Sequence, residues 1–429
     1  MEKALLVIVK LESEEDVWPV EDIVSELEEL ALTSQAEVVD NIITICDKPT
    51  PNFFIGRGKC EEIAVLCDEQ GIDTVIFSRD LSGTQQRNLE EVIGKKTIDR
   101  TQLILDIFAK HAKSPEGKMQ VELAQLQYLM PRLVGKGIIL SRLGGGIGTR
   151  GPGEQKLEVD RRRIRKRIDK LRDDLGHLVL HRKTLRKRRK ENALPLISLV
   201  GYTNAGKSTL INSLTGSDQH VQDSLFTTLD SVSKSLHLPN GENVIISDTV
   251  GFLQNLPHHL IEAFKATLEE VKEADLLIHV LDVSHPRVYE HAQAVMTVLK
   301  ELEAEENPVI MVLNKIDLLD DPVWLNRISN DFPNCVAISA KLKQNLEGLL
   351  KKIEVQFQAK MALIEVTLPH SRMDLVDLFY REGKVKKIEY LNKGIKINAT
   401  LPKIIIDKHL KNIEIKFYKT SIAQVKIHQ

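Results

Sequence analysis

Cysteine, aromatic residues and long apolar runs are all scarce in this sequence. Its 4 cysteines (Cys46, Cys60, Cys67 and Cys335) form no C-x-x-C pair, so their spacing predicts neither a zinc site nor a disulfide framework. We expect buried, reduced thiols in a cytoplasmic protein instead. Aromatic residues make up 4% of the chain, which disfavours a platform for stacking bases. The longest apolar runs, near ten residues, fall well short of the roughly 20 that a membrane span needs.

Charge is balanced overall but unevenly distributed. The 429 residues carry a net charge of −2, and their length predicts roughly two to four domains. Residues 1–50 hold 13 acids and 3 bases, whereas residues 156–190 hold 16 bases and 5 acids. Such a basic stretch favours phosphate, lipid headgroups or an acidic protein as its partner, and a solvated helix face is the plain alternative. The acidic start of the chain does not resemble a secretory signal.

Residues 1–115 alternate between strand-like and helix-like stretches, which predicts a small α/β domain. The stretches with strand character are 4–9, 38–45 and 74–77, and those with helical character are 20–32 and 59–69. This part of the sequence contains no recognisable catalytic or metal-binding pattern.

A helical hairpin is predicted for residues 116–192. Residues 118–133 have helical character, and from 154 to about 190 leucine or isoleucine recurs in the heptad pattern of a coiled coil. The seam consists of Leu157, Ile164, Ile168, Leu171, Leu175, Leu178 and Leu185. Because this seam needs an apolar partner, we expect the preceding helix to pack against it.

The segment 135–153 would form the tip of this hairpin. It holds 8 glycines, three bases and no acid. Glycines let backbone N–H groups approach a ligand closely, and arginines bind phosphate. A basic arm with such a tip is suited to probing folded RNA, with Arg142 and Arg150 as candidate contacts. The competing interpretation is a flexible glycine linker between two domains.

The clearest chemical signal begins at Gly201. A strand-like run, 196–200, leads into GYTNAGKS (201–208) and then into a helical stretch, which is the context of a phosphate-binding loop. Backbone N–H groups and the helix N-terminus of such a loop bind phosphates. We expect Lys207 to contact the β- and γ-phosphates and Ser208 to coordinate Mg²⁺.

Two switch segments follow in the expected order. Thr227 and Thr228 come after the first helix, and Thr228 is expected to close over the γ-phosphate and Mg²⁺. A strand at 244–247 delivers DTVG (248–251). There, Asp248 would hold Mg²⁺ through water and the Gly251 N–H would contact the γ-phosphate.

Two segments predict selection of guanine. A strand at 308–313 ends in NKID (314–317), where the Asp317 carboxylate can accept hydrogen bonds from both N1–H and N2–H₂ of guanine. Adenine lacks this donor pair, so GTP is selected over ATP. Ser339, Ala340 and Lys341 follow another strand and can contact guanine O6 through backbone N–H groups.

Residues 195–360 are therefore predicted to form a P-loop GTPase domain around a mostly parallel, doubly wound sheet. The predicted catalytic groups are Lys207, Thr228 and Gly251, and the predicted metal ligands are Ser208 and Thr228. The full set of predicted nucleotide-binding residues is Gly201, Tyr202, Thr203, Asn204, Ala205, Gly206, Lys207, Ser208, Thr209, Phe226, Thr227, Thr228, Leu229, Asp230, Asp248, Thr249, Val250, Gly251, Asn314, Lys315, Ile316, Asp317, Ser339, Ala340 and Lys341.

The hydrolytic machinery is less complete than the binding site. Phe252 occupies the position at which many GTPases have a glutamine that orients water, and no arginine finger is evident in the sequence. We therefore expect slow hydrolysis that a partner accelerates. Asn204 is a candidate for holding K⁺ near the phosphates, and a loop-stabilising hydrogen bond is its alternative role.

Taken with these motifs, the chain resembles the HflX family of ribosome-associated GTPases. The similarity is most specific at 99–133 and in SRLGGGIGTRGPGE (141–154), and it continues through GYTNAGKST, LFTTLD (225–230) and DTVGF. It covers about residues 1–360. The sequence departs from the family after Glu154, where QKLE stands in place of the more usual TQLE.

The resemblance implies a cytoplasmic, monomeric factor that binds the large ribosomal subunit and its rRNA and that dissociates or rescues stalled or stressed ribosomes. GTP would order the switches and favour binding, and hydrolysis would release the factor. Residues 361–429 predict a small C-terminal α/β domain with strands at 380–390 and 395–401. Three alternatives stay open: a ribosome-assembly GTPase, an RNA-remodelling nucleotidase with a second nucleotide in the N-terminal domain, and a purely structural RNA-binding module.

Overall fold

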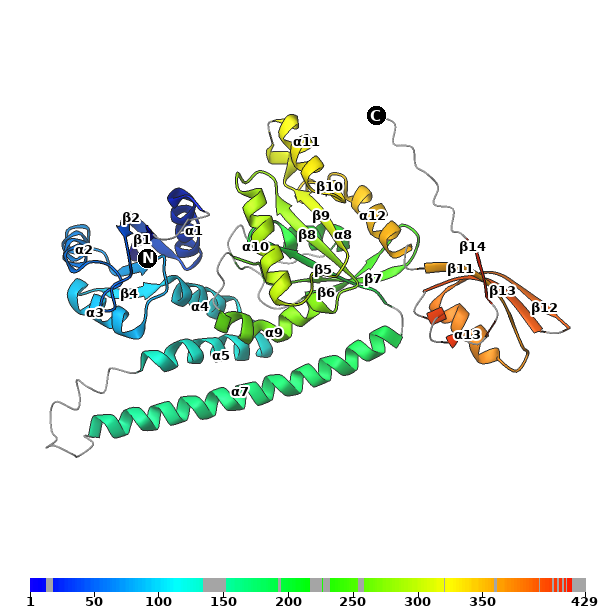
Figure 1. The fold of residues 1–429 in the computed structure, drawn as a ribbon, viewed down its shortest axis with the longest axis horizontal. Coiled ribbons are helices and arrows are strands. Elements are labelled where there is room, and N and C mark those ends of the chain that lie inside the picture. Colours follow the sequence, from blue (N-terminus) through cyan, green and yellow to red (C-terminus); the bar gives the residue numbers. More distant parts are fainter. Residues whose placement is uncertain are drawn as a thin grey trace.

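The computed structural model describes residues 1–12, 18–133, 152–191, 194–216, 226, 232–253, 258–319, 321–358, 361–392, 394–402, 405–406, 409–410, 413 and 415–418. Three sheets and one long helix dominate these residues (Figure 1). Several predicted site residues lie outside the described part: Arg142, Arg150, Thr227, Thr228, Leu229 and Asp230.

The N-terminal sheet is parallel, with the order β2-β1-β3-β4. Successive residues of β1 face opposite sides, so Leu6 packs beneath α1 and α4, whereas Leu5 packs beneath α2 and α3. This confirms an α/β architecture, although the sequence patterns did not predict α3, β4 or α4. The elements are β1 (Glu2–Leu11), α1 (Val20–Thr33), β2 (Ala36–Cys46), α2 (Arg57–Gln70), β3 (Thr74–Phe77), α3 (Gly83–Ile93), β4 (Lys96–Asp99) and α4 (Arg100–His111).

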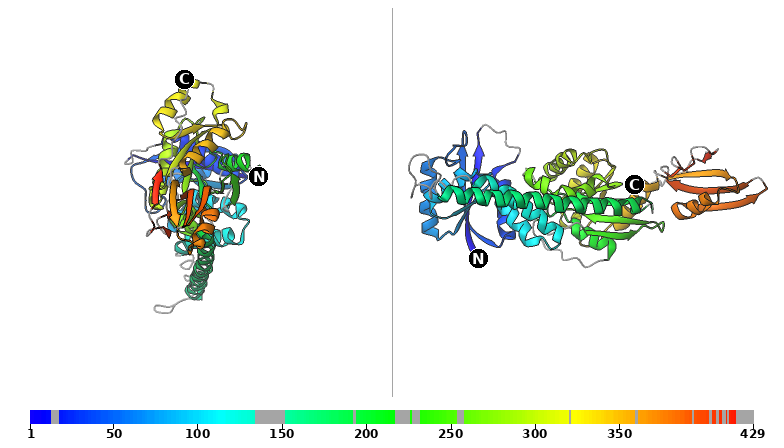
Figure 2. Two further views of the ribbon diagram at one scale, coloured as in Figure 1. Left: turned by 90° about the vertical axis from the view of Figure 1, so that its right-hand side faces the viewer. Right: turned by 90° about the horizontal axis from the view of Figure 1, so that it is seen from below.

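The arm consists of α5 (Pro115–Arg132) and the 40-residue α7 (Pro152–Glu191), which pack side by side. Ile168, Leu171 and Leu175 are buried in the contact, so the predicted seam is confirmed there. The side chains of Leu157 and Leu185 lie outside the described set. In the view from below, α7 crosses in front of the N-terminal sheet and the central sheet (Figure 2).

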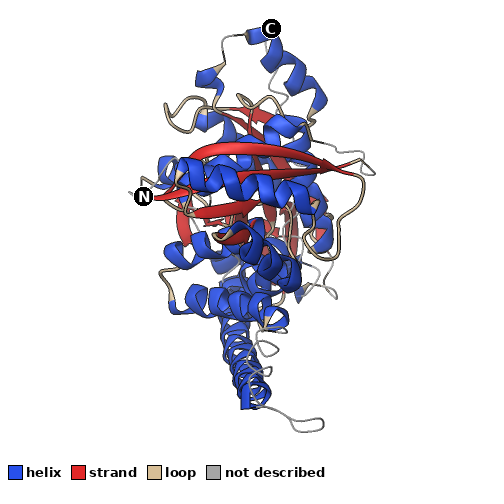
Figure 3. Cartoon of the chain, turned by 90° about the vertical axis from the view of Figure 1, so that its left-hand side faces the viewer, coloured by secondary structure: helices blue, strands red, loops and turns tan. Residues whose placement is uncertain are grey.

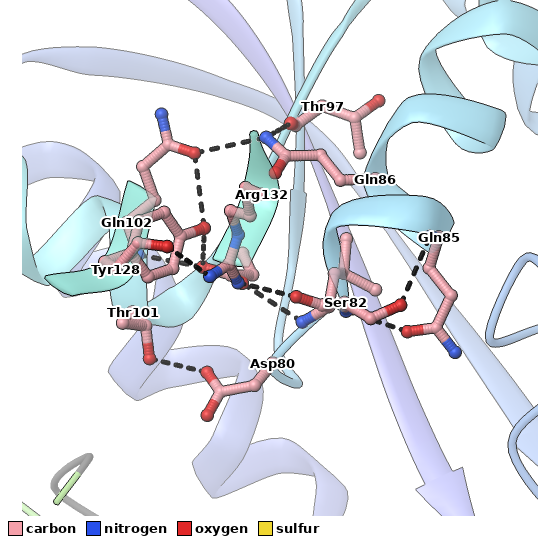
Figure 4. A network of polar contacts seen from close by, with 11 residues as sticks. Asp80, Ser82, Gln85, Gln86, Thr97, Thr101, Gln102, Tyr128 and Arg132 are labelled. Atoms are coloured by element: carbon pink, nitrogen blue, oxygen red, sulfur yellow. Dashed lines mark hydrogen bonds and ion pairs between the residues drawn. The ribbon is translucent and has the colours of Figure 1, made fainter. Parts of the chain in front are cut away.

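A buried polar network fastens the end of α5 to the N-terminal sheet (Figure 4). The Arg132 guanidinium donates to the Leu81 carbonyl at 2.5 Å and to Asp99 Oδ2 at 2.9 Å. The Tyr128 hydroxyl donates to the other Asp99 oxygen at 2.9 Å, and the Arg132 guanidinium lies 3.4 Å above the Tyr128 ring. Burial raises the pKa of Asp99, and Arg132 opposes that shift. The helix end that leads into the glycine-rich segment is therefore held in place.

The central sheet has the order β10-β9-β8-β5-β7-β6, in which only the β6–β7 pair is antiparallel. Helices cover both faces, α8 and α12 on one and α9 and α10 on the other, which confirms the mostly parallel, doubly wound sheet. Figure 3 views the chain from the N-terminal side, with the N-terminal sheet in front of the central domain. The elements are β5 (Leu196–Gly201), α8 (Lys207–Thr215), β6 (Val232–His237), β7 (Asn243–Asp248), α9 (His258–Lys272), β8 (Leu276–Asp282), α10 (Val288–Glu301), β9 (Val309–Asn314), η1 (Ile316–Leu318), α11 (Pro322–Asp331), β10 (Cys335–Ala337) and α12 (Leu346–Gln358).

The third sheet is antiparallel, with the order β12-β13-β11-β14, and α13 packs on one face. The predicted strand 380–390 is wrong at its start, because Tyr380 lies on α13. Leu375, Val376 and Phe379 form an apolar helical stripe toward the sheet, so the helix continues until residue 382. The elements are β11 (Met361–Leu368), α13 (Met373–Glu382), β12 (Lys384–Leu391), β13 (Gly394–Pro402) and β14 (Ile415–Tyr418).

One continuous hydrophobic core joins the N-terminal sheet, the arm and the central sheet. Within this core the Phe108 ring of α4 meets the Phe264 ring of α9 edge-on, with 5.0 Å between ring centroids. All four cysteines are free; burial raises the pKa of the Cys60 and Cys67 thiols to about 11, whereas Cys46 and Cys335 are half-buried. Across the described residues, no helix is long and apolar enough to cross a membrane.

Candidate nucleotide-binding site

The phosphate-binding loop joins β5 to α8 at the carboxyl edge of the central sheet. Gly206 caps the helix with φ 93°, a backbone conformation that side-chain-bearing residues seldom adopt. A Cβ on Gly206 would lie 2.3 Å from Asn314 Nδ2. That amide group donates to the Ala205 carbonyl at 2.8 Å, so the loop and the predicted base-binding segment are in direct contact.

Lys207 is buried at the start of α8. Its ammonium group donates to the Gly201 carbonyl at 3.0 Å and to the Tyr202 carbonyl at 2.8 Å. Burial lowers the pKa of Lys207 to about 8, and the Asp248 carboxylate opposes that change. A phosphate placed here would meet a cation that is poorly solvated and therefore available for strong pairing.

Two of the residues predicted around Mg²⁺, Ser208 and Asp248, lie side by side, whereas the predicted ligand Thr228 lies outside the described residues. The Ser208 hydroxyl donates to Asp248 Oδ2 at 2.7 Å, which joins the first turn of α8 to the end of β7. Hydroxyl and carboxylate oxygens are the ligands that Mg²⁺ prefers, so the pair fits this ion. When bound, Mg²⁺ neutralises charge on the phosphate oxygens.

Gly251 and Phe252 lie against the loop. The Thr203 N–H donates to the Phe252 carbonyl at 2.9 Å, and the Phe252 N–H donates to the Gly201 carbonyl at 3.1 Å. A Cβ on Gly251 would lie 2.8 Å from Thr203 Cγ2 and 3.2 Å from the Lys207 ammonium group. The Phe252 ring is buried in the shared core. The backbone of Gly251 therefore lies beside Lys207, while the phenyl ring of Phe252 is part of the hydrophobic core.

The predicted guanine-binding segments come together at the ends of β9 and β10. Asn314 Oδ1 accepts a hydrogen bond from the Ala340 N–H at 2.9 Å, so the two predicted base-binding segments are in direct contact. Asp317 Oδ1 is buried and has no hydrogen-bond partner among the described residues. A ligand donor would satisfy this oxygen, since unpaired buried acceptors are costly.

Several contacts near the site have no counterpart in the sequence predictions. Asp282, at the end of β8, pairs with the Lys315 ammonium group at 2.7 Å; its place at a strand's carboxyl end was a usable signal. The Phe226 ring meets the Phe108 ring edge-on at 4.5 Å between centroids. Glu26 of α1 contacts Tyr202. No local pattern predicts these last two contacts, because each joins distant parts of the chain.

A doubly wound sheet whose carboxyl edge carries a phosphate-binding loop, a serine–aspartate pair suited to Mg²⁺ and an N-K-x-D segment defines a P-loop GTPase. The family model described as 50S ribosome-binding GTPase matches residues 196–315. Two further models, GTP-binding GTPase N-terminal and GTP-binding GTPase Middle Region, match residues 21–109 and 111–189. The chain belongs to the HflX family of GTPases, and it is a GTP hydrolase that binds its nucleotide together with Mg²⁺.

The family assignment rests on curated relatives of similar length. GTPase HflX of Caldanaerobacter subterraneus subsp. tengcongensis is 49% identical over 399 residues, covering 93% of this chain and 90% of the relative. GTPase HflX of Escherichia coli is 39% identical over 407 residues, covering 95% and 94%. Among solved structures, a GTP-binding protein from Sulfolobus solfataricus in complex with GDP is 27% identical, with 83% and 98% coverage and a TM-score of 0.44.

Proposed function

We propose that this GTPase binds the large ribosomal subunit in its GTP state and dissociates or rescues stalled or stressed ribosomes. The observation that carries the proposal is the shared core. Leu171 of the basic helix α7 and Phe252 beside the phosphate loop belong to the same hydrophobic cluster. A change at the nucleotide can therefore reach the arm through packed side chains rather than through a linker.

The outer faces of α7 support RNA as the partner. Its buried seam faces α5, and basic side chains are exposed elsewhere on the helix at Arg162, Arg163, Arg165, Lys166, Lys170 and Arg172. Arginine and lysine at this density bind phosphates, and the affinity then falls steeply with salt. The glycine-rich segment with Arg142 and Arg150 is proposed to make the contacts at the tip.

Hydrolysis is proposed to be slow until the ribosome supplies what the site lacks. Phe252 offers no group that could orient water, and its ring is buried. Single-turnover hydrolysis with and without large subunits tests this: we expect a marked acceleration, and a fast unassisted rate would overturn the proposal.

Asn204, exposed and with φ 59°, is proposed to hold K⁺ near the phosphates. Faster hydrolysis in K⁺ than in Na⁺ at equal ionic strength is the expected result.

Sucrose-gradient profiles separate the proposed role from the alternatives. Dissociation of purified ribosomes by the protein with GTP favours splitting. Accumulation of precursor subunits in cells lacking the protein favours a role in assembly. An RNA-remodelling nucleotidase with a second site would bind two nucleotides per chain, whereas we expect one.

A further inference from the structure

Tyr202 belongs to the phosphate-binding loop, yet its side chain leaves the nucleotide site and enters the N-terminal domain. The ring is buried and stacks on His291 of α10, with 3.9 Å between ring centroids and an angle of 2° between the planes. Trp18, just before α1, stacks on His291 from 5.4 Å. The Tyr202 hydroxyl donates to Glu26 Oε2 at 2.5 Å.

Glu26 is itself held from a second element. Arg100, the first residue of α4, donates to Glu26 Oε1 through Nε at 3.1 Å and through Nη2 at 2.6 Å. The Arg100 and Glu26 side chains are only 13% and 16% exposed, so this charge-assisted pair is poorly screened by water. Each carboxylate oxygen of Glu26 thus has a partner: one is held by Arg100 and the other holds Tyr202.

The backbone of Tyr202 touches the reacting end of the site. Its carbonyl accepts a hydrogen bond from the Lys207 ammonium group at 2.8 Å, and it forms a β-bridge with Phe252. Direct contacts therefore run from Arg100 through Glu26 and Tyr202 to Lys207.

We propose that Glu26 is a positioning residue for the GTP site, acting from the N-terminal domain. Through the Tyr202 hydroxyl it sets the position of the loop carbonyl that orients Lys207, and so it strengthens phosphate binding. Coupling of this kind is reciprocal, so a bound nucleotide must in turn hold the N-terminal domain more firmly against the central domain. The proposal concerns nucleotide binding alone and does not depend on the ribosomal role.

The test compares Glu26→Gln and Tyr202→Phe with the matched control Asp22→Asn in the full-length chain. Both test variants keep the shape of the side chain, and Tyr202→Phe keeps the stacked ring. Asp22 lies one turn before Glu26 on α1 and accepts from Arg287 Nε at 2.7 Å at the same interface, so its carboxylate pairs with α10's end of the interface rather than with Tyr202 of the loop.

The measurements are the dissociation rates of a fluorescent GDP and a fluorescent non-hydrolysable GTP analogue, together with kcat and KM. We expect each test variant to release nucleotide about tenfold faster, the size expected for one hydrogen bond to a charged group. KM should rise more than kcat falls, and the double variant should be no worse than either single one, because both remove the same contact.

Asp22→Asn should change these rates less than twofold. The proposal is overturned if the test variants lower the thermal unfolding temperature but leave the dissociation rates at the wild-type value, which is the result for a merely structural contact. It is also overturned if the effects of the two substitutions add, or if Asp22→Asn matches Glu26→Gln.

Discussion

The Ser208 hydroxyl lies 2.7 Å from Asp248 Oδ2, so two oxygens predicted to lie around Mg²⁺ meet where α8 begins and β7 ends. One comes from the phosphate-binding loop and the other from the D-x-x-G segment, 40 residues further along the chain. This pairing places the proposed metal beside Lys207.

Ser208→Ala should weaken the effect of Mg²⁺ on nucleotide binding. With one oxygen ligand removed, we expect the Mg²⁺ concentration that half-maximally slows GDP release to rise about tenfold. Thr215→Ala is the matched control, because the Thr215 hydroxyl lies in the last turn of the same helix and donates to the Ile211 carbonyl. Equal Mg²⁺ dependence in wild type and Ser208→Ala would remove Ser208 from the metal site.

Asp317→Asn should change which base is bound. The amide offers a donor where guanine N2–H₂ needs an acceptor, so GTP affinity should fall by at least a hundredfold. Xanthine has a carbonyl at that position and can accept from the amide, so xanthosine triphosphate should bind the variant better than the wild type. Competition between the two nucleotides measures this, and an unchanged preference for GTP would contradict the assignment of Asp317.

Nucleotide affinity should fall as the pH rises above about 8. Burial lowers the pKa of Lys207 to about 8 in the free protein, whereas bound phosphates favour the charged form. Below pH 8 the lysine is charged before and after binding, so affinity is flat. Above it, binding takes up a proton, and affinity falls by up to tenfold per pH unit. GDP titrations between pH 6.5 and 9 test this; Lys207→Arg, which stays charged, should lose this pH dependence.

Arg132→Ala should destabilise the N-terminal domain, and the loss of stability should be larger at high pH. Breaking a buried ion pair costs about 3–5 kcal/mol, because the Asp99 carboxylate stays buried without its cation. Burial already raises the pKa of Asp99 above its value in the unfolded chain. Between these two pKa values the folded protein binds more protons than the unfolded chain, so its stability falls as the pH rises.

Chemical denaturation at pH 5 and pH 8 measures that loss, which should be smaller at pH 5, where the orphaned acid takes up a proton. The double variant Arg132→Ala with Asp99→Asn, which leaves no buried charge, should recover part of the stability at pH 8. A pH-independent loss would contradict this reading of the network.

The sequence alone predicted most of the architecture, because periodicity reports burial directly. Leu171 and Leu175 repeat at heptad spacing and are buried in the arm as that spacing predicts. The alternating pattern wrongly predicted a strand at Tyr380, which lies on α13. A short amphipathic helix and a strand can have a similar content of apolar residues, so the pattern did not separate them. The helices α3 and α4 were missed, although Ser82 and Asp99, residue types that commonly begin helices, cap them.

The motifs of the nucleotide site could also be predicted from the sequence, but the residues that hold these motifs in place could not. Lys207 and Asp317 occupy positions whose spacing is set by phosphate and base geometry. Tyr202 occupies a variable position of the loop motif, and its partner Glu26 lies 176 residues away. Only the folded chain brings such pairs together, so the spacing of residues in the sequence does not predict these contacts.

The most direct test of the whole account is sedimentation of the full-length protein with purified 50S subunits, in GDP and in a non-hydrolysable GTP analogue. We predict at least tenfold tighter binding with the analogue, and loss of that binding when Arg142 and Arg150 are both changed to glutamate. Equal affinity in the two nucleotides, or undiminished affinity after the charge reversal, would contradict the claim that the terminal phosphate of GTP controls docking of the basic arm.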